Sequence, residues 1–175
     1  MMASATNTLS DFFGIGVYVD GFFMNDTMVT SSKEVDSRNY CQRGQRPRSF
    51  AMPTFIFCQD GSKLVLGSSG GDRIPQTVMQ IIVRYFKGET LQEACDRPRL
   101  FIDGYVYRIE DSKTIDPENR LSKSGFYKVG FSNNEFFGAF NAVGVDANGK
   151  AFGASDGRRY GSFSSEGEVD PENDG

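Results

Sequence analysis

The sequence reads Gly67-Ser68-Ser69-Gly70-Gly71-Asp72-Arg73-Ile74-Pro75-Gln76 at the point where a strand-like segment, residues 63–67, gives way to an apolar helical pattern. Pro75 falls in the first turn of that predicted helix, where proline is favoured. Adjacent glycines before a helix can aim their backbone N–H groups at one place, and the helix dipole adds positive potential there. The run therefore predicts either a tight strand-to-helix connection or a site for an anion or a developing oxyanion.

The segments on either side of this run predict short strands joined by tight turns. Asp20-Gly21 and Gln59-Asp60-Gly61-Ser62 each separate two apolar stretches, a pattern typical of β-hairpins. A third turn, Asp146-Ala147-Asn148-Gly149, separates two more such stretches. The strands that we expect are residues 17–19, 22–24, 55–58, 63–66, 139–145 and 150–153.

Helical patterns occupy the middle of the chain. Thr90-Leu91-Gln92-Glu93 is a capping box that opens a short helix before Pro98, and Asp116-Pro117-Glu118 predicts another, which ends at Gly125. Because strands precede and follow the helices, the order predicts an α+β fold with an antiparallel sheet. Residues 75–87 form the longest predicted helix, and we expect its apolar stripe to lie in the core: Val78, Met79, Ile81, Ile82, Val83, Tyr85 and Phe86.

Composition indicates a single globular domain. The 175 residues are 38% hydrophobic and carry a net charge of −4, which favours a soluble fold and offers no basic surface for nucleic acid. No apolar run approaches the length of a membrane span, and the N-terminal segment lacks the basic and apolar regions of a signal peptide. We expect the domain to span residues 1–164 and the acidic residues 165–175 to form a disordered tail.

The chain contains no histidine, which excludes Ser-His-Asp and Cys-His catalysis and most zinc sites. A hydrolase with this composition needs a nucleophile with another base, such as its own N-terminal amine. The three cysteines, Cys41, Cys58 and Cys95, lack metal-ligand spacing, so we expect free thiols, with a single disulfide as the alternative. We predict no metal and no cofactor.

Further motifs occur in a recognisable order around the glycine run. They are Thr6-Asn7-Thr8-Leu9, Gly21-Phe22-Phe23-Met24-Asn25-Asp26, Arg46-Pro47-Arg48-Ser49-Phe50, Leu91-Gln92-Glu93-Ala94 with Arg97-Pro98-Arg99, and Gly153-Ala154-Ser155-Asp156-Gly157-Arg158-Arg159. On these motifs the chain resembles the C-terminal, small-subunit part of the γ-glutamyltranspeptidases, a family of N-terminal-nucleophile hydrolases. The resemblance implies part of an αββα sandwich with mostly antiparallel strands.

The same resemblance implies γ-glutamyl transfer or hydrolysis through an acyl-enzyme. In the family an autocatalytic cut frees a threonine, whose α-amine serves as the base and whose hydroxyl attacks a γ-glutamyl amide. Carried over by position, Gly70 and Gly71 form the oxyanion hole. Thr8 corresponds to the second threonine, which hydrogen-bonds the nucleophile.

The substrate pocket departs from the glutathione-type members of the family. Ser49 stands at the position for the substrate carboxylate, and Asp26 and Thr27 belong to the turn near the donor's amino group. Those members carry acidic residues after that turn, whereas residues 27–30 here contain no carboxylate. Arg48 replaces an apolar residue and offers a planar fork suited to a carboxylate, although it also fits a solvated lid. These differences favour poly-γ-glutamate, the substrate of the capsule-processing branch.

The family's nucleophilic threonine lies on a strand that precedes the segment matching residues 6–14, and this sequence begins after it. We therefore expect these residues alone to be inactive and to need that strand and a large-subunit-like partner chain. The alternative is a non-catalytic remnant or a carboxylate-binding module that keeps the pocket. Family members are usually exported, so the resemblance implies an extracytoplasmic location.

Asp156-Gly157-Arg158-Arg159 predicts either two cations near the pocket or a turn held by a structural Asp–Arg pair.

Overall fold

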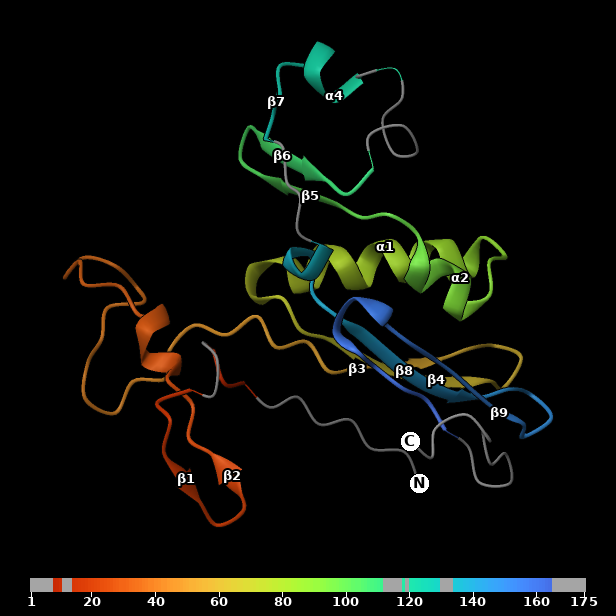
Figure 1. Cartoon of the computed structure of the whole chain (residues 1–175), viewed down its shortest axis with the longest axis horizontal. Helices are drawn as coiled ribbons and strands as arrows, with labels where there is room; N and C mark the ends of the chain where they lie inside the picture. Colours follow the sequence, from red (N-terminus) through yellow and green to blue (C-terminus); the bar gives the residue numbers. More distant parts are fainter. Residues whose placement is uncertain (1–7, 11–13, 112–117, 119, 130–133, 165–175) are drawn as a thin grey trace.

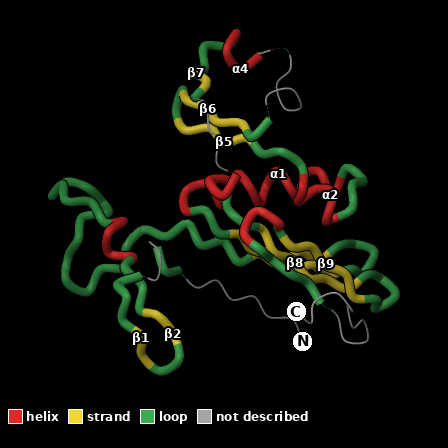
Figure 2. The backbone as a smooth tube through the Cα atoms, viewed as in Figure 1, coloured by secondary structure: helices red, strands yellow, loops and turns green. Residues whose placement is uncertain are grey.

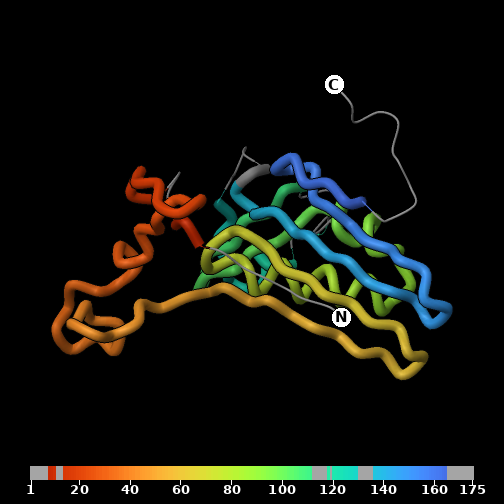
Figure 3. The backbone as a smooth tube through the Cα atoms, turned by 90° about the horizontal axis from the view of Figure 1, so that it is seen from below, coloured from red at the N-terminus to blue at the C-terminus, as the bar shows by residue number. Residues whose placement is uncertain are grey.

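A four-stranded antiparallel sheet forms the centre of the computed structural model, which describes residues 8–10, 14–111, 118, 120–129 and 134–164. Its strands, labelled in Figure 1, lie in the order β3-β4-β8-β9, as two of the predicted hairpins placed side by side; Figure 3 shows them from below. The predicted acidic tail lies outside the described residues. The strand bounds are β3 (Thr54–Phe57), β4 (Lys63–Ser68), β8 (Phe140–Val145) and β9 (Ala151–Ser155).

Two helices cover one face of this sheet (Figure 1). α1 (Ile74–Phe86) follows the glycine run through a 3-10 turn, η2 (Gly71–Arg73), and has proline in its first turn as predicted. α2 (Leu91–Asp96) opens with the predicted capping box: Glu93 N–H donates to Thr90 Oγ1 at 3.2 Å, and the Glu93 carboxylate accepts Thr90 N–H at 2.8 Å. Local sequence signals therefore set where both helices begin.

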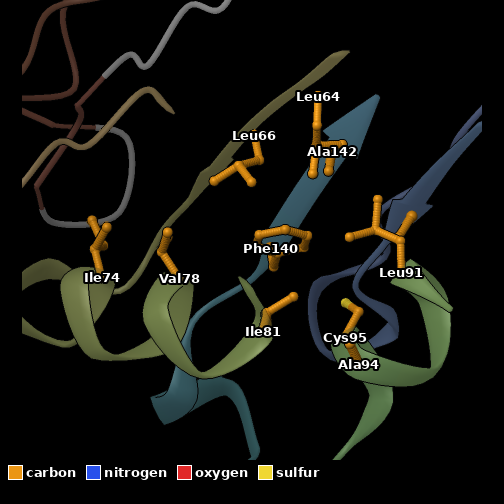
Figure 4. Close-up of a cluster of buried hydrophobic side chains, with 11 residues drawn as sticks. Leu64, Leu66, Ile74, Val78, Ile81, Leu91, Ala94, Cys95, Phe140 and Ala142 are labelled. Carbon is orange, nitrogen blue, oxygen red and sulfur yellow. The ribbon is translucent and has the colours of Figure 1, made fainter. Parts of the chain in front are cut away.

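The hydrophobic core lies between the sheet and these helices (Figure 4). β8 alternates buried and exposed residues, as expected for a strand with one covered face. Burying each large aliphatic or aromatic side chain contributes about 1.5–3 kcal/mol, so this layer is the main source of stability. The core side chains are Leu64, Leu66, Ile74, Val78, Ile81, Leu91, Ala94, Cys95, Phe140, Ala142 and Ala154.

The predicted apolar stripe of α1 is only partly buried. Val78 and Ile81 are fully buried, as expected, but Met79, Val83 and Phe86 are 57%, 42% and 57% exposed. The prediction that these three residues lie in the core is wrong. They follow one another at spacings of four and three residues and so form a second row on the helix, turned away from the row that contacts the sheet.

The opposite face of the sheet has no helix against it among the described residues (Figure 3). Phe55 and Phe57 of β3 are 44% and 71% exposed, and Val143 of β8 is 49% exposed. Phe55 pairs with Val65 and Val65 with Val143, which makes an apolar row across the sheet. One helical layer on one antiparallel sheet is half of an αββα sandwich, in agreement with the predicted α+β class.

A second, smaller sheet packs beyond α1 and was not predicted. It contains β5 (Leu100–Asp103), β6 (Val106–Ile109) and β7 (Tyr127–Lys128), with β6 and β7 parallel. The helix predicted before Gly125 is present as α4 (Arg120–Lys123), although its predicted start at Asp116-Pro117 lies outside the described residues. The β5-β6 hairpin turns at Asp103-Gly104, the same signal as Asp20-Gly21, so the sequence indicated it and the prediction missed it. The two-residue β7 carries too short a pattern to be distinguished from a loop.

The described residues before β3, 8–10 and 14–53, form an N-terminal arm that extends from the core and is mostly irregular (Figure 2). It contains the predicted hairpin as β1 (Tyr18–Val19) and β2 (Phe22–Phe23), followed by a 3-10 helix, η1 (Thr27–Thr30). All three cysteines are free thiols, as expected. Among the described helices, none combines the length and apolar character needed to cross a membrane.

Candidate active site

A cavity of about 740 Å³ lies where β4 ends and the glycine run begins. The sheet supplies its floor, the N-terminal arm supplies one wall, and the segment after β9 supplies another. Of the residues predicted for the site, all except Asp26 line this cavity. Its lining residues include Thr8, Thr27, Arg48, Ser49, Ser68, Ser69, Gly70, Gly71, Arg73, Ala139 and Arg159.

The two glycines turn the chain sharply from β4 into η2. Gly70 has φ 128° and Gly71 has φ 62°, a backbone region that other residues seldom adopt. The Gly70 carbonyl accepts the Arg73 N–H at 3.3 Å, which starts the helical turn. Within the described part of the chain, neither the Gly70 nor the Gly71 N–H donates to a protein acceptor. Both donors remain available at the start of a helix, where negative charge is stabilised.

A reciprocal set of hydrogen bonds fixes this turn to the segment before β8. Ser69 N–H donates to the Ala139 carbonyl at 2.9 Å, and Ala139 N–H donates to Ser69 Oγ at 3.0 Å. Ser68 Oγ donates to the same Ala139 carbonyl at 3.0 Å. A side chain on Gly138 would collide with the Ser69 carbonyl, and one on Gly70 would approach the Gly138 Cα to 3.3 Å. The close approach of two backbones therefore requires both glycines.

Thr8 and Thr27 reach the cavity because the N-terminal arm folds back on itself. Asp26 N–H donates to the Leu9 carbonyl at 3.2 Å, which holds the segment containing Thr8 beside the start of η1. Thr27 N–H donates to Asn25 Oδ1 at 3.0 Å. Asp26 itself is half-buried and fixes the arm through its backbone, so the structure does not place it with the other predicted residues around the cavity.

Arg48 and Ser49 enter the cavity wall through a second set of contacts within the arm. Arg48 N–H donates to Asn39 Oδ1 at 2.9 Å, and its carbonyl accepts the Thr30 hydroxyl at 3.2 Å. The Arg48 guanidinium lies over the Phe50 ring, 4.8 Å from its centroid, and remains solvent-exposed. A guanidinium held over an aromatic ring by a cation–π contact keeps its in-plane N–H donors available to other groups.

Two further arginines line the cavity, and sequence reasoning assigned them no firm role there. Arg73 lies over the Phe136 ring at 4.2 Å and pairs with Asp72 at 3.0 Å; burial lowers the pKa of its guanidinium. Arg159 Nη1 donates to Ser69 Oγ at 3.3 Å. No aspartate or glutamate is found among the described lining residues. In a protein of net charge −4, the cavity is therefore locally cationic.

The Asp-Gly-Arg-Arg motif divides between the two alternatives that the sequence left open. Arg158 does not line the cavity; its guanidinium binds Glu110 at 2.6 Å and Asp156 at 3.1 Å. Arg159, its neighbour, does line it. One arginine is structural and the other belongs to the candidate site.

Comparison with known proteins agrees with this arrangement. The family model described as gamma-glutamyltranspeptidase matches residues 1–165 of the chain. The chain belongs to this family. It is 34% identical over 166 residues to the capsule biosynthesis protein CapD proenzyme of Bacillus anthracis, covering 94% of this chain and 31% of that protein. It is 30% identical over 165 residues to the glutathione hydrolase proenzyme of Bacillus subtilis strain 168, covering 91% of this chain and 28% of that protein.

The solved structures match at the level of a whole chain. The crystal structure of the Bacillus anthracis transpeptidase CapD superposes with a TM-score of 0.75 at 34% identity, covering 94% of this chain and 92% of the chain compared. The present chain thus spans less than a third of the length of these two curated relatives but nearly all of one chain of the CapD structure. The family, the N-terminal-nucleophile hydrolase fold and the likeness to the capsule branch are confirmed.

Proposed function

We propose that this chain is the small-subunit part of an enzyme that cleaves or transfers γ-glutamyl amides, with poly-γ-glutamate as its substrate. The cavity carries the proposal, because it joins two available backbone donors to three arginines without an acidic lining residue. The chemistry of such a cavity suits a reaction that develops an oxyanion on a substrate rich in carboxylates.

The proposed reaction begins with a threonine on a strand upstream of the described residues. Its hydroxyl attacks the γ-carbonyl carbon while its α-amine takes the proton, and the carbonyl π electrons move onto oxygen. Gly70 and Gly71 N–H groups donate to that oxyanion, and the Thr8 hydroxyl orients the nucleophile. Collapse breaks the C–N bond, the amine leaves with the proton, and an ester remains on the threonine. Water or an amine acceptor then attacks the ester and releases the threonine.

Substrate selection is assigned to the cationic wall. Arg48 lines the cavity from the N-terminal arm and Arg159 from the segment after β9. The two arginines bind carboxylates of successive γ-linked glutamates. Thr27 and Ser49 add hydroxyl donors beside Arg48. A hydrogen bond to a charged group contributes about 1.5–3 kcal/mol, so each arginine is worth about tenfold or more in affinity.

A partner chain completes the proposed enzyme. The exposed apolar row on the open face of the sheet, with Phe55, Phe57 and Val143, needs a covering layer, and a large-subunit-like chain supplies it in an αββα sandwich. Both relatives, CapD of Bacillus anthracis and the glutathione hydrolase of Bacillus subtilis, are proenzymes, which supports a processed enzyme here. By the same resemblance, we place the enzyme outside the cytoplasm.

The test uses the protein expressed from its complete gene, supplied with a chromogenic γ-glutamyl anilide and with poly-γ-glutamate. We expect release of the aniline and shortening or transfer of the polymer. Arg159→Gln should raise KM for the polymer by about tenfold, whereas Arg43→Gln, an exposed arginine that does not line the cavity, should leave it unchanged. Binding of γ-glutamate oligomers without any turnover would identify a carboxylate-binding module instead. The absence of both binding and turnover would refute the proposal.

A further inference from the structure

A buried ion pair lies behind the cavity without lining it. The Arg99 and Asp156 side chains are both 0% exposed, and Arg99 Nη2 donates to Asp156 Oδ2 at 2.5 Å. A buried ion pair adds little stability compared with well-packed apolar residues, because both charges lose their hydration. Its contacts with the residues around it therefore suggest another role.

One side of the pair reaches the turn that supports the glycines. Arg99 Nη1 donates to the Phe137 carbonyl at 3.0 Å and to the Gly138 carbonyl at 3.5 Å. Thr77 Oγ1 approaches the same Phe137 carbonyl at 3.4 Å. Residues 137–139 are the segment that holds Ser69 by hydrogen bonds and lies against Gly70. The position of Arg99 thus sets the position of the two proposed oxyanion donors.

The other side of the pair reaches the arginine in the cavity. Asp156 Oδ2 also accepts the Phe140 N–H at 3.0 Å, and Oδ1 accepts the Arg158 N–H at 3.0 Å. The Asp156 carbonyl accepts the Arg159 N–H at 3.3 Å. These bonds define the 3-10 turn η4 (Gly157–Arg159), which presents Arg159 to Ser69.

Glu110, the residue directly after β6, closes the network. Its carboxylate binds Arg158 through two bonds, at 2.6 Å to Nε and 2.7 Å to Nη2. It also accepts the Arg99 N–H at 2.7 Å. One carboxylate thus ties the backbone of Arg99 to the residue next to Arg159, so the two sides of the ion pair cannot move independently.

We propose that the Arg99–Asp156 pair consists of positioning residues that hold the Gly70-Gly71 turn and Arg159 in register across the cavity. The inference rests on the proposed function, because it assigns the pair a part in placing the oxyanion donors relative to the carboxylate-binding arginine. Neither residue touches the substrate. Each acts through a backbone segment, Arg99 through residues 137–138 and Asp156 through η4. One pair of side chains therefore positions both sides of the site.

The test compares Arg99→Lys with Ile81→Ala in the protein expressed from its complete gene. Lysine keeps the charge near Asp156 but cannot reach both Asp156 and the carbonyls of residues 137 and 138, because it has a single nitrogen. Ile81 is a fully buried core residue outside the cavity lining, so Ile81→Ala reports a loss of stability alone.

Two readouts separate positioning from simple destabilisation. For Arg99→Lys we expect kcat for the γ-glutamyl anilide to fall by about a hundredfold with KM changed by less than about threefold. Amide hydrogen exchange at Ser69 and Ala139 should become faster in Arg99→Lys and stay near the wild-type rate in Ile81→Ala. If Arg99→Lys does not fold, Asp156→Asn, which keeps the shape and removes the charge, is measured in its place.

The positioning role is overturned if Arg99→Lys and Ile81→Ala change amide hydrogen exchange and kcat to the same extent. It is also overturned if amide exchange at Ser69 and Ala139 is unchanged in Arg99→Lys. Absence of turnover in the wild-type protein overturns the proposed function instead. In that case the exchange experiment still decides whether the pair holds the turn.

Discussion

Gly70→Ala should reduce both stability and turnover, because Gly70 combines an unusual backbone conformation with a close neighbour. Its φ of 128° lies outside the left-handed helical region, and such conformations cost other residues about 1–3 kcal/mol. The added Cβ would also lie 3.3 Å from the Gly138 Cα. Gly138 cannot retreat, because it already lies against the Ser69 carbonyl. We therefore expect a loss near 3 kcal/mol and a displaced turn.

Two other glycines provide matched controls. Gly71 has φ 62° and Gly149, in the hairpin turn between β8 and β9, has φ 82°; a Cβ on either meets no atom within 4 Å. Gly71→Ala and Gly149→Ala should each cost about 1–2 kcal/mol, the ordinary penalty of a left-handed conformation. Gly149→Ala should leave turnover unchanged, since that turn does not line the cavity.

The assay is urea unfolding of all three variants together with turnover of a γ-glutamyl anilide by the protein expressed from its complete gene. We expect kcat to fall roughly a hundredfold in Gly70→Ala, because the displaced turn moves one oxyanion donor out of reach although its N–H remains, and much less in Gly71→Ala, whose added Cβ meets no neighbouring atom. Equal losses of stability in Gly70→Ala and Gly149→Ala would refute the reasoning from the Gly138 contact. Wild-type turnover in Gly70→Ala would refute the oxyanion role.

Three other properties can be measured on the same protein. Thr90→Ala removes the capping box of α2 and should lower the free energy of unfolding by about 1 kcal/mol in urea titrations, whereas Thr90→Ser should preserve it. Burial alone would raise the pKa of Asp156, but Arg99 and two backbone N–H donors lower it below its ordinary value of 3.8. Asp156 therefore contributes stability at neutral pH that is lost as the pH falls below about 3.8, and Asp156→Asn should flatten that loss in unfolding curves. Burial, with Asp156 nearby, raises the pKa of Cys95 to about 12, so an alkylating reagent at pH 8 should modify the exposed Cys41 and leave Cys95 intact by mass spectrometry unless the protein unfolds.

Much of the local structure follows from the sequence because its signals act over a few residues. Asp20-Gly21 and Asn148-Gly149 adopt tight turns by their own conformational preferences, and both hairpins are present. Thr90 and Glu93 bond each other within one helical turn, and the start of α2 is where the capping box predicts it. The family motifs also identify the glycine run and Ser49, since these residues are recognisable without knowledge of their neighbours in space.

The tertiary structure alone decided which residues meet. Ser69 and Ala139 are 70 positions apart, and only the pairing of β4 with β8 brings them into contact. Arg158 and Arg159 are adjacent and chemically identical, yet one is held by Glu110 and the other lines the cavity. The short η4 turn points successive side chains in different directions, and nothing in the sequence specifies which direction faces the site.

The sequence by itself thus determined the family, the turns, the helix starts and the candidate residues on the glycine run. It did not determine that Met79 lies on the exposed side of α1 or that Arg99 supports the turn at Gly138. Burial and long-range hydrogen bonds depend on how the sheet and helices pack together. That packing is a property of the whole chain, whereas caps and turns depend on the dihedral preferences and hydrogen bonds of neighbouring residues.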